Sequence, residues 1–481
     1  MAQIDVSQTP SYALLLAGAW QHREPAYEVR SPYSNAVIAR VSRANAADVE
    51  SAIAAAVAAF EQTRQLPAYL RAQVLRDISA AVAARAEELA VTIAQEAAKP
   101  IKHARAEVQR CVFTFAWAAE ETGRIAAELL PMDVLAAGVG RQGLVKRFPI
   151  GPVAAITPFN FPLNLVAHKL APAIAAGCPV VLKPASQTPI SSLKLAEIIL
   201  ATDWPAAGLS VLSLASSDAA LLVRDERIKA LTFTGSPAVG WALKSQAGRK
   251  RVMLELGGNA GVIIHHDAPI EQAVARVVAG GFAFAGQSCI SVQRVFVHES
   301  IYEAFLEQLI PAVERLHVGD PLDEASDLSA LITPADCERV AAWLAEARAA
   351  GAQIRTGGVV DERTVRPTVI TDAHADLKVN CQELFAPVIT VQPYTHEREA
   401  LDAVNQGDFG LQAGLFTNDL RFIWQAYETL EVGGLIVNDV PTWRADHMPY
   451  GGVKQSGFGR EGLRYAIEEL TEPRLLVLGV G

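Results

Sequence analysis

Three side chains of this sequence stand in surroundings where they could do chemistry: Cys289, Glu255 and Asn160. The thiolate of Cys289 could attack a carbonyl carbon and give a tetrahedral adduct. The side-chain amide of Asn160 and the backbone N–H of Cys289 could stabilise the oxyanion that forms. Glu255 is flanked by Leu254 and Leu256, so burial should raise its pKa and let it take a proton from an attacking water. These residue types suit covalent catalysis followed by hydrolysis.

Each of these residues also has a purely structural interpretation. Most cysteines are small buried hydrophobic residues, and Asn160, between two phenylalanines, could cap a turn. Glu255 could pair with a basic residue of the stretch 249–251. If Cys289 is catalytic, we expect a lowered pKa that makes its thiolate available. The remaining cysteines match no catalytic motif and keep the structural interpretation: Cys111, Cys178, Cys337 and Cys381.

The composition bears on the class of protein. A chain of 481 residues is too long for one hydrophobic core, so two or three domains are expected. The net charge of −10 argues against a nucleic-acid partner. We find no signal peptide, no stretch apolar enough to span a membrane, no CxxC pair and no metal-ligand spacing of histidines. We therefore expect a cytoplasmic protein without disulfide bonds and without a bound metal.

The elements that must position these residues alternate along the chain. After a short extended start, helical spacing of apolar residues covers 45–60, 67–99 and 99–130. Short apolar strands are then expected within 151–162, 179–186, 209–214 and 228–235, and a helix over 191–202. This alternation predicts a parallel α/β sheet with helices on both faces, in which ligands gather at the carboxyl ends of the strands.

A second α/β unit is expected from about residue 256 to residue 437. Its helices should cover 301–316 and 337–351, and its strands 291–298 and 433–439. The stretches 143–151 and 474–480 are typical of strands but have no obvious partner nearby. Such strands often complete a sheet elsewhere or in another subunit.

A glycine turn, GSPAVG at residues 235–240, leads into a predicted helix. Its backbone amides could face a pyrophosphate, although ordinary helix capping explains the same residues. The turn matches neither the GxGxxG fingerprint nor a P-loop.

Six stretches now stand in order: TPFNFP around Asn160, KPAS at 183–186, LELGGN around Glu255, GQSC at Cys289, ELFAPV at 383–388 and MPYGGVKQSGFGREG at 448–462. This set, with Cys289 34 positions after Glu255, resembles the aldehyde dehydrogenase superfamily from about residue 31 to the end. The resemblance implies NAD(P)-dependent, non-acylating oxidation of an aldehyde to its acid, as in members that act on succinic semialdehyde, lactaldehyde or phosphonoacetaldehyde. Cys289, Asn160 and Glu255 would then have the roles described above.

The resemblance also implies an α/β fold with three parts. A Rossmann-type cofactor domain would comprise residues 1–125 and 147–254, and an α/β catalytic domain residues 255–455. A small β oligomerisation element would comprise residues 126–146 and 456–481, and the protein would be a homodimer or a homotetramer.

The cofactor implied by the resemblance is NAD or NADP. Lys183 would reach the adenosine ribose, Gly235 and Ser236 would lie near the pyrophosphate, and Glu383 would hold the nicotinamide ribose beside Phe385. Many NAD-specific relatives have a glutamate where this chain has Ser186, and a neutral hydroxyl should tolerate the 2′-phosphate of NADP. The remaining expected cofactor contacts are Thr157, Pro158, Phe159, Val239 and Leu256. Ala215 and Ala386 replace glycines that are common in relatives.

The expected substrate pocket contains an arginine where many relatives have an aromatic residue, Arg444. A buried guanidinium is costly unless an anion meets it, so Arg444 should hold the acidic group of a short aldehyde. The alternative is that Arg444 pairs with Asp446 or Asp439 at the rim. The other expected lining residues are Phe161, His168, Ser288, Ile290, Tyr450 and Arg110.

Two other functions stay open at this point. A CoA-acylating relative would transfer the acyl group to CoA in place of water, but such relatives generally lack the glutamate base. A binding or structural relative would be expected to lose Cys289, Asn160 or Glu255, and all three are present.

Overall fold

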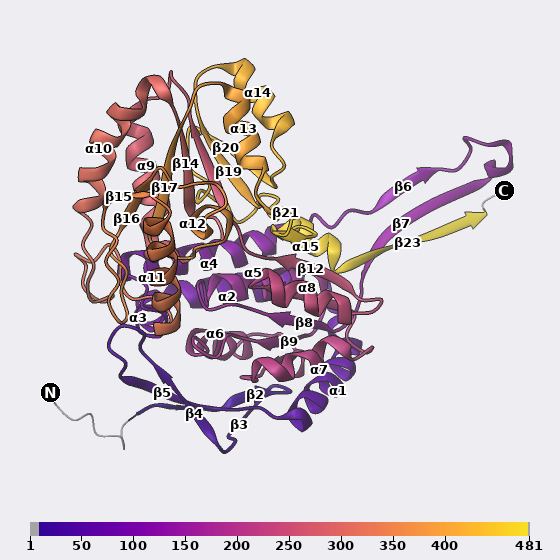
Figure 1. The fold of residues 1–481 in the computed structure, drawn as a ribbon. Helices are drawn as coiled ribbons and strands as arrows, with labels where there is room; N and C mark the ends of the chain where they lie inside the picture. Colours follow the sequence, from indigo (N-terminus) through magenta and orange to yellow (C-terminus); the bar gives the residue numbers. More distant parts are fainter. Residues whose placement is uncertain (1–8, 480–481) are drawn as a thin grey trace.

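The computed structural model describes residues 9–479, which form two α/β lobes and a projecting arm (Figure 1). The first lobe is built on a sheet of order β22-β12-β11-β8-β9-β10-β2-β3, in which β12 to β10 are parallel. The central strands are β12 (Arg251–Glu255), β11 (Ala230–Thr234), β8 (Val153–Ile156), β9 (Val180–Lys183) and β10 (Leu209–Val211), and the edges are β2 (Leu14–Leu16), β3 (Ala19–Gln21) and β22 (Gly457–Phe458). The predicted parallel α/β sheet is confirmed.

Helices pack against this sheet. Helix α1 (Ala46–Thr63) begins as predicted at Asn45, whose side chain accepts hydrogen bonds from the N–H groups of Ala47 and Asp48. The other helices are α2 (Ala68–Ala84), α3 (Ala86–Ala97), α4 (Ile101–Thr122), α5 (Asn164–Ala176), α6 (Ile190–Leu200), α7 (Ala219–Arg224), α8 (Pro237–Gln246) and α15 (Leu463–Glu469). Every residue of α5 is buried, so its polar side chains must find partners inside the protein.

Two helix predictions were wrong in their bounds. The stretch 67–99 is divided at Arg85, whose backbone leaves the helical region with φ −105° and ψ 21°. The predicted helix over 99–130 ends at Thr122, because Gly123 caps it and residues Glu128–Pro131 pair as strand β6 with β7 (Arg141–Pro149).

The second lobe contains a sheet of order β15-β16-β17-β14-β13-β19-β20. Its strands are β15 (Gln353–Thr356), β16 (Thr368–Thr371), β17 (Val388–Tyr394), β14 (Val292–His298), β13 (Ala260–Ile264), β19 (Gln412–Phe416) and β20 (Gly434–Val437). Its helices are α9 (Ile270–Phe282), α10 (Tyr302–Glu314), α11 (Pro334–Ala349), α12 (Lys378–Cys381), α13 (Glu397–Asn405) and α14 (Leu420–Thr429). Smaller sheets join β1 (Ser11–Tyr12), β5 (Val37–Ser42) and β4 (Ala26–Arg30), and join β18 (Phe409–Gly410) to β21 (Val453–Lys454).

The arm consists of β6, β7 and β23 (Thr471–Gly479) and extends away from both lobes (Figure 1). Strands were expected near 143–151 and 474–480 with no partner nearby in the sequence, and the structure pairs them with each other: β23 pairs with β7 over its whole length. The division into three domains stays a proposal. Within residues 9–479, no helix is long and apolar enough to cross a membrane.

Candidate active site

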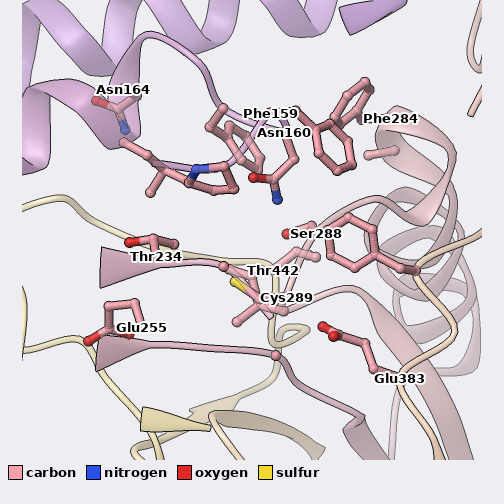
Figure 2. A pocket seen from close by; sticks show the side chains of 18 of the residues that line it. Phe159, Asn160, Asn164, Thr234, Glu255, Phe284, Ser288, Cys289, Glu383 and Thr442 are labelled. Carbon is pink, nitrogen blue, oxygen red and sulfur yellow. The ribbon is translucent and has the colours of Figure 1, made fainter. Parts of the chain in front are cut away.

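A cavity of about 500 Å³ lies where the carboxyl ends of the first sheet face the second lobe. Figure 2 shows Cys289 in its middle, with Glu255 and Glu383 on either side and Asn160 above. The structure brings most of the predicted site residues to this cavity: Arg110, Pro158, Phe159, Asn160, Phe161, Gly235, Ser236, Glu255, Leu256, Ser288, Cys289, Ile290, Glu383, Phe385, Arg444 and Tyr450.

Five predicted residues do not line the cavity itself. Thr157 and Lys183 are buried at the ends of β8 and β9, where the Thr157 N–H donates to the Lys183 carbonyl at 3.1 Å. Ser186 follows β9, and Val239 is exposed on α8. His168 is buried on α5 behind the cavity wall.

The loop that presents Cys289 leaves α9 through an unusual backbone. Phe284 and Ala285 have φ values of 50° and 53°, a left-handed conformation that non-glycine residues rarely adopt. The backbone at Gly258 also comes close to this loop. A Cβ on Gly258 would lie 2.0 Å from the Cys289 carbonyl oxygen, so only glycine allows the two segments to pack this closely. The second glycine of LELGGN therefore lets the strand end after Glu255 pack against the Cys289 loop.

Asn160 lies close to this loop. Its Nδ2 donates to the carbonyl of Gln287 at 3.1 Å, which leaves the second N–H for a ligand, and its Oδ1 has no hydrogen-bond partner among the described residues. The loop that contains Asn160 is held by Lys99, whose Nζ donates to the Asn160 carbonyl at 2.6 Å and is paired with Glu107. Glu107 in turn accepts the backbone N–H groups of residues 163 and 164.

Lys99 also joins the Asn160 loop to the Cys289 loop. Its Nζ lies 3.7 Å from the ring centre of Phe161 and 4.4 Å from that of Phe284. The sequence analysis did not identify Lys99 or Glu107. The available signal was their placement eight positions apart at the start of a helix, but nothing in the sequence connects them to Asn160.

The electrostatics of Cys289 differ from the expectation. Burial raises the pKa of the thiol to about 12, against the smaller lowering effect of a hydrogen bond with Tyr450. The predicted low pKa was therefore wrong, because burial, together with the charges of Glu383 and Glu255, outweighs the hydrogen bond with Tyr450.

Glu255 ends β12 and has no hydrogen-bond partner for either carboxylate oxygen within residues 9–479. Burial, followed by the charge of Glu461, raises its pKa well above the usual value, as the sequence predicted. The alternative of an ion pair with the basic stretch 249–251 was wrong: Arg251 binds backbone carbonyls of residues 468–471 and Lys250 that of Ala247. An unpaired buried carboxyl group suits a general base.

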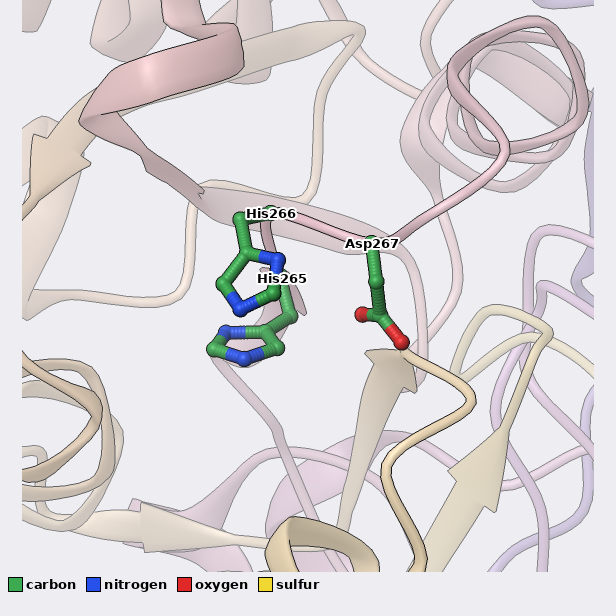
Figure 3. A group of neighbouring side chains, drawn as sticks. All are labelled: His265, His266 and Asp267. Carbon is green, nitrogen blue, oxygen red and sulfur yellow. The ribbon is translucent and has the colours of Figure 1, made fainter.

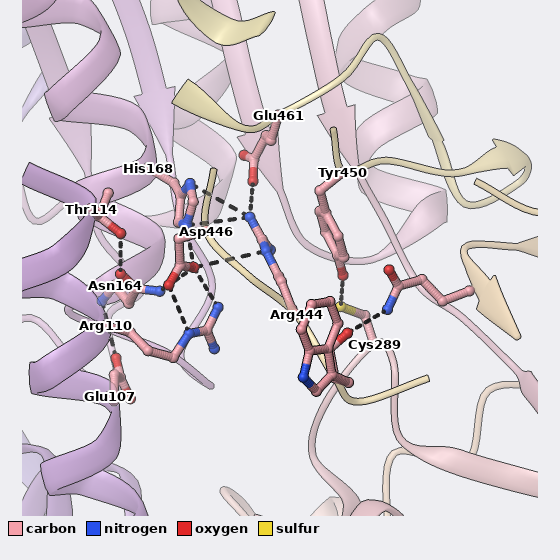
Figure 4. A network of polar contacts seen from close by, with 12 residues as sticks. Glu107, Arg110, Thr114, Asn164, His168, Cys289, Arg444, Asp446, Tyr450 and Glu461 are labelled. Carbon is pink, nitrogen blue, oxygen red and sulfur yellow. Dashed lines mark hydrogen bonds and ion pairs between the residues drawn. The ribbon is translucent and has the colours of Figure 1, made fainter. Parts of the chain in front are cut away.

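A network of charges lies beside Tyr450 (Figure 4). Asp446 accepts both Nε and Nη2 of Arg110, at 3.1 and 2.6 Å, and also contacts His168 Nε2 at 2.8 Å. Glu461 is bonded to Lys169 and lies 3.4 Å from Arg444 Nη2. Sequence analysis missed Lys169 and Glu461 and named Asp446 only as an alternative partner of Arg444, because the contacts of these residues join segments far apart in the chain.

The Arg444 side chain is 95% buried, and its Nη2 lies 3.3 Å from His168 Nε2 and 3.4 Å from Glu461. Its Nε lies 3.9 Å from Asp446, beyond hydrogen-bond distance, and has no hydrogen-bond partner in the described part of the chain. The alternative pairing with Asp439 was wrong, since Asp439 is bonded to Arg276. The guanidinium carbon instead lies 3.6 Å from the ring centre of Tyr450.

The residues at the strand ends fit a dinucleotide cofactor. The buried hydroxyls of Thr157 and Thr234, at the ends of β8 and β11, have no hydrogen-bond partner among residues 9–479. Glu383 accepts the Gly258 N–H at 2.9 Å, and a Cβ on Gly257 would lie 2.3 Å from its second oxygen. Burial raises the pKa of Glu383 to about 7. These unpaired polar groups and close glycines suit the ribose and pyrophosphate of a nucleotide.

A second group of polar side chains lies outside this cavity, at the end of β13 (Figure 3). Ligand atoms of His265, His266 and Asp267 lie within 4.8 Å of one another. Both oxygens of Asp267 already accept hydrogen bonds, from Thr417 Oγ1 and the Asn418 N–H, each at 2.8 Å. These contacts explain the group as a joint between β13 and the start of α14, and we assign no metal to it.

The family model of the aldehyde dehydrogenase family matches residues 20–476. The chain belongs to this family. It is 44% identical over 476 residues to 3-sulfolactaldehyde dehydrogenase of Priestia megaterium, covering 99% of both chains. It is 37% identical to lactaldehyde dehydrogenase of Methanocaldococcus jannaschii, covering 97% of this chain and all of the relative.

Solved structures agree with this assignment. Aldehyde dehydrogenase 21 of Physcomitrella patens, solved with its product succinate, has 43% identity and a TM-score of 0.96, with coverage of 98% of this chain and 99% of the other. Glyceraldehyde-3-phosphate dehydrogenase GapN of Methanocaldococcus jannaschii, solved with NADP, has 37% identity and a TM-score of 0.90, with coverage of 94% and 98%. The predicted fold and the predicted NAD(P)-dependent oxidation of aldehydes are thus confirmed.

Proposed function

We propose that this aldehyde dehydrogenase oxidises a short acidic aldehyde, with Cys289 as nucleophile, Asn160 as oxyanion donor and Glu255 as base. Substrates of this class are 3-sulfolactaldehyde, succinic semialdehyde, sulfoacetaldehyde and phosphonoacetaldehyde. Neutral polar aldehydes such as lactaldehyde come second. The observation that carries the substrate class is the pair of arginines, Arg110 and Arg444, that lines the cavity beside Cys289.

The charges around these arginines support an anionic substrate. Three cationic side chains, Arg110, Arg444 and Lys169, lie in the network with two anionic ones, Asp446 and Glu461. Burial would raise the pKa of both carboxyl groups. The neighbours Lys169, His168 and Arg444 instead hold the pKa of Glu461 at about 2, and the hydrogen bonds from His168 and Arg110 hold that of Asp446 below its usual range. His168 is buried and its pKa is lowered, so it stays neutral. These five side chains together carry one net positive charge, which favours a carboxylate, sulfonate or phosphonate at the far end of the substrate.

The names of relatives point the same way. The 3-sulfolactaldehyde dehydrogenase cited above has a sulfonate in its named substrate, and the plant relative was solved with succinate, a dicarboxylate. Sulfoacetaldehyde dehydrogenase of Neptuniibacter caesariensis is 33% identical over 94% of this chain and 99% of its own. These similarities support the acidic class without selecting one compound.

The chemistry begins with Cys289. Its Sγ bonds to the aldehyde carbon, and the π electrons of the carbonyl move to oxygen, which accepts the Asn160 Nδ2–H and the Cys289 backbone N–H. A nicotinamide cofactor, when bound, would supply the acceptor for the hydride of this carbon. Glu255 takes a proton from water as the water oxygen attacks the thioester, and Sγ leaves as the acid is released.

The cofactor would be held by the strand ends. Glu383 and Phe385 would face the nicotinamide ribose, Gly235 and Ser236 the pyrophosphate, and Lys183 the adenosine ribose. Thr157, Pro158, Phe159, Val239 and Leu256 would complete this surface. Ser186 would let NADP bind, because a serine does not repel a 2′-phosphate as a glutamate would.

A panel of aldehydes tests the proposal. Succinic semialdehyde and butanal have the same number of carbons and differ at the far end, so kcat/KM with each isolates the contribution of the acidic group. We expect a preference for succinic semialdehyde of about tenfold or more with NAD or NADP, as one charge-assisted contact provides. A preference for butanal would contradict the acidic class, and turnover that requires CoA would point to acyl transfer.

We further propose a cytoplasmic homodimer or homotetramer. All five cysteines are free, which suits a reducing compartment. The arm carries an exposed row of leucines that would be covered in an oligomer: Leu129 is 73% exposed, Leu144 41% and Leu476 51%.

A further inference from the structure

Tyr450 contacts the reacting sulfur directly. Its hydroxyl lies 3.2 Å from Cys289 Sγ, which is the hydrogen bond drawn at the centre of Figure 4. The backbone of Tyr450 is fixed by two hydrogen bonds with Glu461, at 3.0 and 2.6 Å. The phenol therefore points at Sγ from a rigid support.

Arg444 packs against the aromatic ring of Tyr450. Its guanidinium carbon is 3.6 Å from the ring centre of Tyr450, a close cation–π contact in a desolvated place. A cation over the ring draws electron density from the phenol and makes its O–H a stronger donor. The free Nε of Arg444 shows that hydrogen bonds alone do not fix the side chain in this position.

The charged groups that face the thiol and the phenol are Arg444, Glu255 and Glu383. Of these three charged groups, Arg444 is the cation, and its positive charge favours the thiolate form of Cys289. Burial raises the pKa of Tyr450 well above its usual value, so the phenol keeps its proton and can donate it to sulfur. The hydroxyl of Tyr450 is the side-chain donor within hydrogen-bond distance of Sγ in the described part of the chain.

We propose that Tyr450 is a catalytic residue that donates its O–H to the Cys289 thiolate, and that Arg444 is a positioning residue that strengthens this donor through the ring. The inference rests on the proposed role of Cys289 as nucleophile. When the thiol ionises, its proton passes to water and the electron pair stays on Sγ, where the phenol O–H now donates. The hydrogen bond is released as Sγ bonds to the aldehyde carbon.

The first test is alkylation of Cys289 by iodoacetamide in Tyr450→Phe, which keeps the ring and its contact with Arg444. The rate at pH 8 reports the thiolate fraction, and mass spectrometry identifies the alkylated residue. A hydrogen bond to a charged group shifts a pKa by about one to two units, so we expect a fall of tenfold or more. Tyr427→Phe, on the exposed face of α14, is the control and should react at the wild-type rate. Equal rates in wild type and Tyr450→Phe would overturn the proposal.

The second test is a double-mutant cycle with Arg444→Leu. If Arg444 acts through the phenol, the fall in alkylation rate in Tyr450→Phe/Arg444→Leu is smaller than the product of the two single falls. Independent effects would remove the positioning role of Arg444. Circular dichroism and thermal melting confirm that each variant is folded.

A third measurement separates this proposal from the proposed substrate. Tyr450→Phe keeps both arginines, so the kcat/KM ratio of succinic semialdehyde to butanal should match wild type, although both values fall. If wild type shows no acidic preference, the proposed substrate fails while the alkylation result still decides the role of Tyr450. A loss of the acidic preference in Tyr450→Phe would show that the hydroxyl binds substrate instead, and would overturn its assignment to the thiolate.

Discussion

Glu255 differs from an ordinary buried glutamate because neither oxygen has a partner among residues 9–479. An unpaired carboxyl group in such a place is protonated until the pH rises above its raised pKa. A general base at this position therefore becomes more effective as the pH rises, and its rate contribution is lost on acidification.

Substituting Glu255→Gln separates hydrolysis from the steps that precede it. We expect the single-turnover burst of NAD(P)H to survive, while steady turnover falls by about 10² to 10⁴, the usual contribution of a general base. The pH-dependent rise of the wild-type steady rate should disappear as well. Stopped-flow absorbance at 340 nm measures both phases, and a burst that fell together with the steady rate would place Glu255 before the thioester.

Arg444 is the residue on which the proposed substrate class depends most. In Arg444→Leu, kcat/KM for succinic semialdehyde should fall by about 10² or more, equivalent to roughly 3 kcal/mol, because an anion loses its partner. The kcat/KM for butanal should fall less, because butanal loses only the contribution of the weakened Tyr450 hydrogen bond to Cys289. Arg276→Leu, outside the cavity and paired with Asp439, is the control. Equal losses for both aldehydes would make the role of Arg444 structural.

At the scale of helices and strands, the sequence predicted the strands that end at the active site. It did not predict the contacts between distant segments that hold the active-site loops in place. Motifs at Asn160, Glu255 and Cys289 could be identified because each is a local string of residues. The expected alternation of strands and helices follows from local apolar periodicity in the same way. Strand β6 was missed because its pairing with β7 decides its structure while the local pattern stays helical. The break at Arg85 was missed because the local pattern stays helical there as well.

Lys99 is the clearest example of what the sequence could not provide. It lies just before α4, yet it contacts both the loop after β8 and the loop after α9. Burial lowers the pKa of its ammonium group, while Glu107 favours the charged form. The pair stabilises only if both members are present, because one alone would be a buried unpaired charge.

Lys99→Met should therefore have two effects. Glu107 loses its partner, so the free energy of unfolding should fall by about 3 to 5 kcal/mol, measured by urea titration. The Asn160 loop loses its support, so kcat should fall by about tenfold or more with a smaller change in KM. The second variant Lys99→Met/Glu107→Gln removes the stranded charge. We expect it to regain stability but not kcat, and recovery of both would mean that Lys99 affects only folding.

At the scale of the whole molecule, the arm projects from the two lobes and has exposed leucines that neither lobe covers. Leu129, Leu144 and Leu476 lie side by side across its three strands, because β23 and β6 both pair with β7 at Leu144. A bare apolar row on a projecting sheet is costly in water, and a second copy of the chain would cover it. The row Leu129, Leu144 and Leu476 lies on one face of the arm. The other face has two exposed apolar side chains of its own, Leu475 (56%) and Val477 (42%), and there Val477 pairs with Gly143, close to Met132.

Placing a charge in this row tests the proposed oligomer. Leu476→Arg should reduce the molar mass from light scattering toward that of one 51.4 kDa chain at micromolar concentration, because a buried unpaired guanidinium opposes association. The matched variant Val477→Arg changes the neighbouring residue on the other face and should keep the wild-type mass. Since the cavity lies in the lobes and not in the arm, the Leu476→Arg protein should still oxidise its aldehyde. A monomeric wild type, or an unchanged mass in Leu476→Arg, would show that the leucine row is not the contact between subunits.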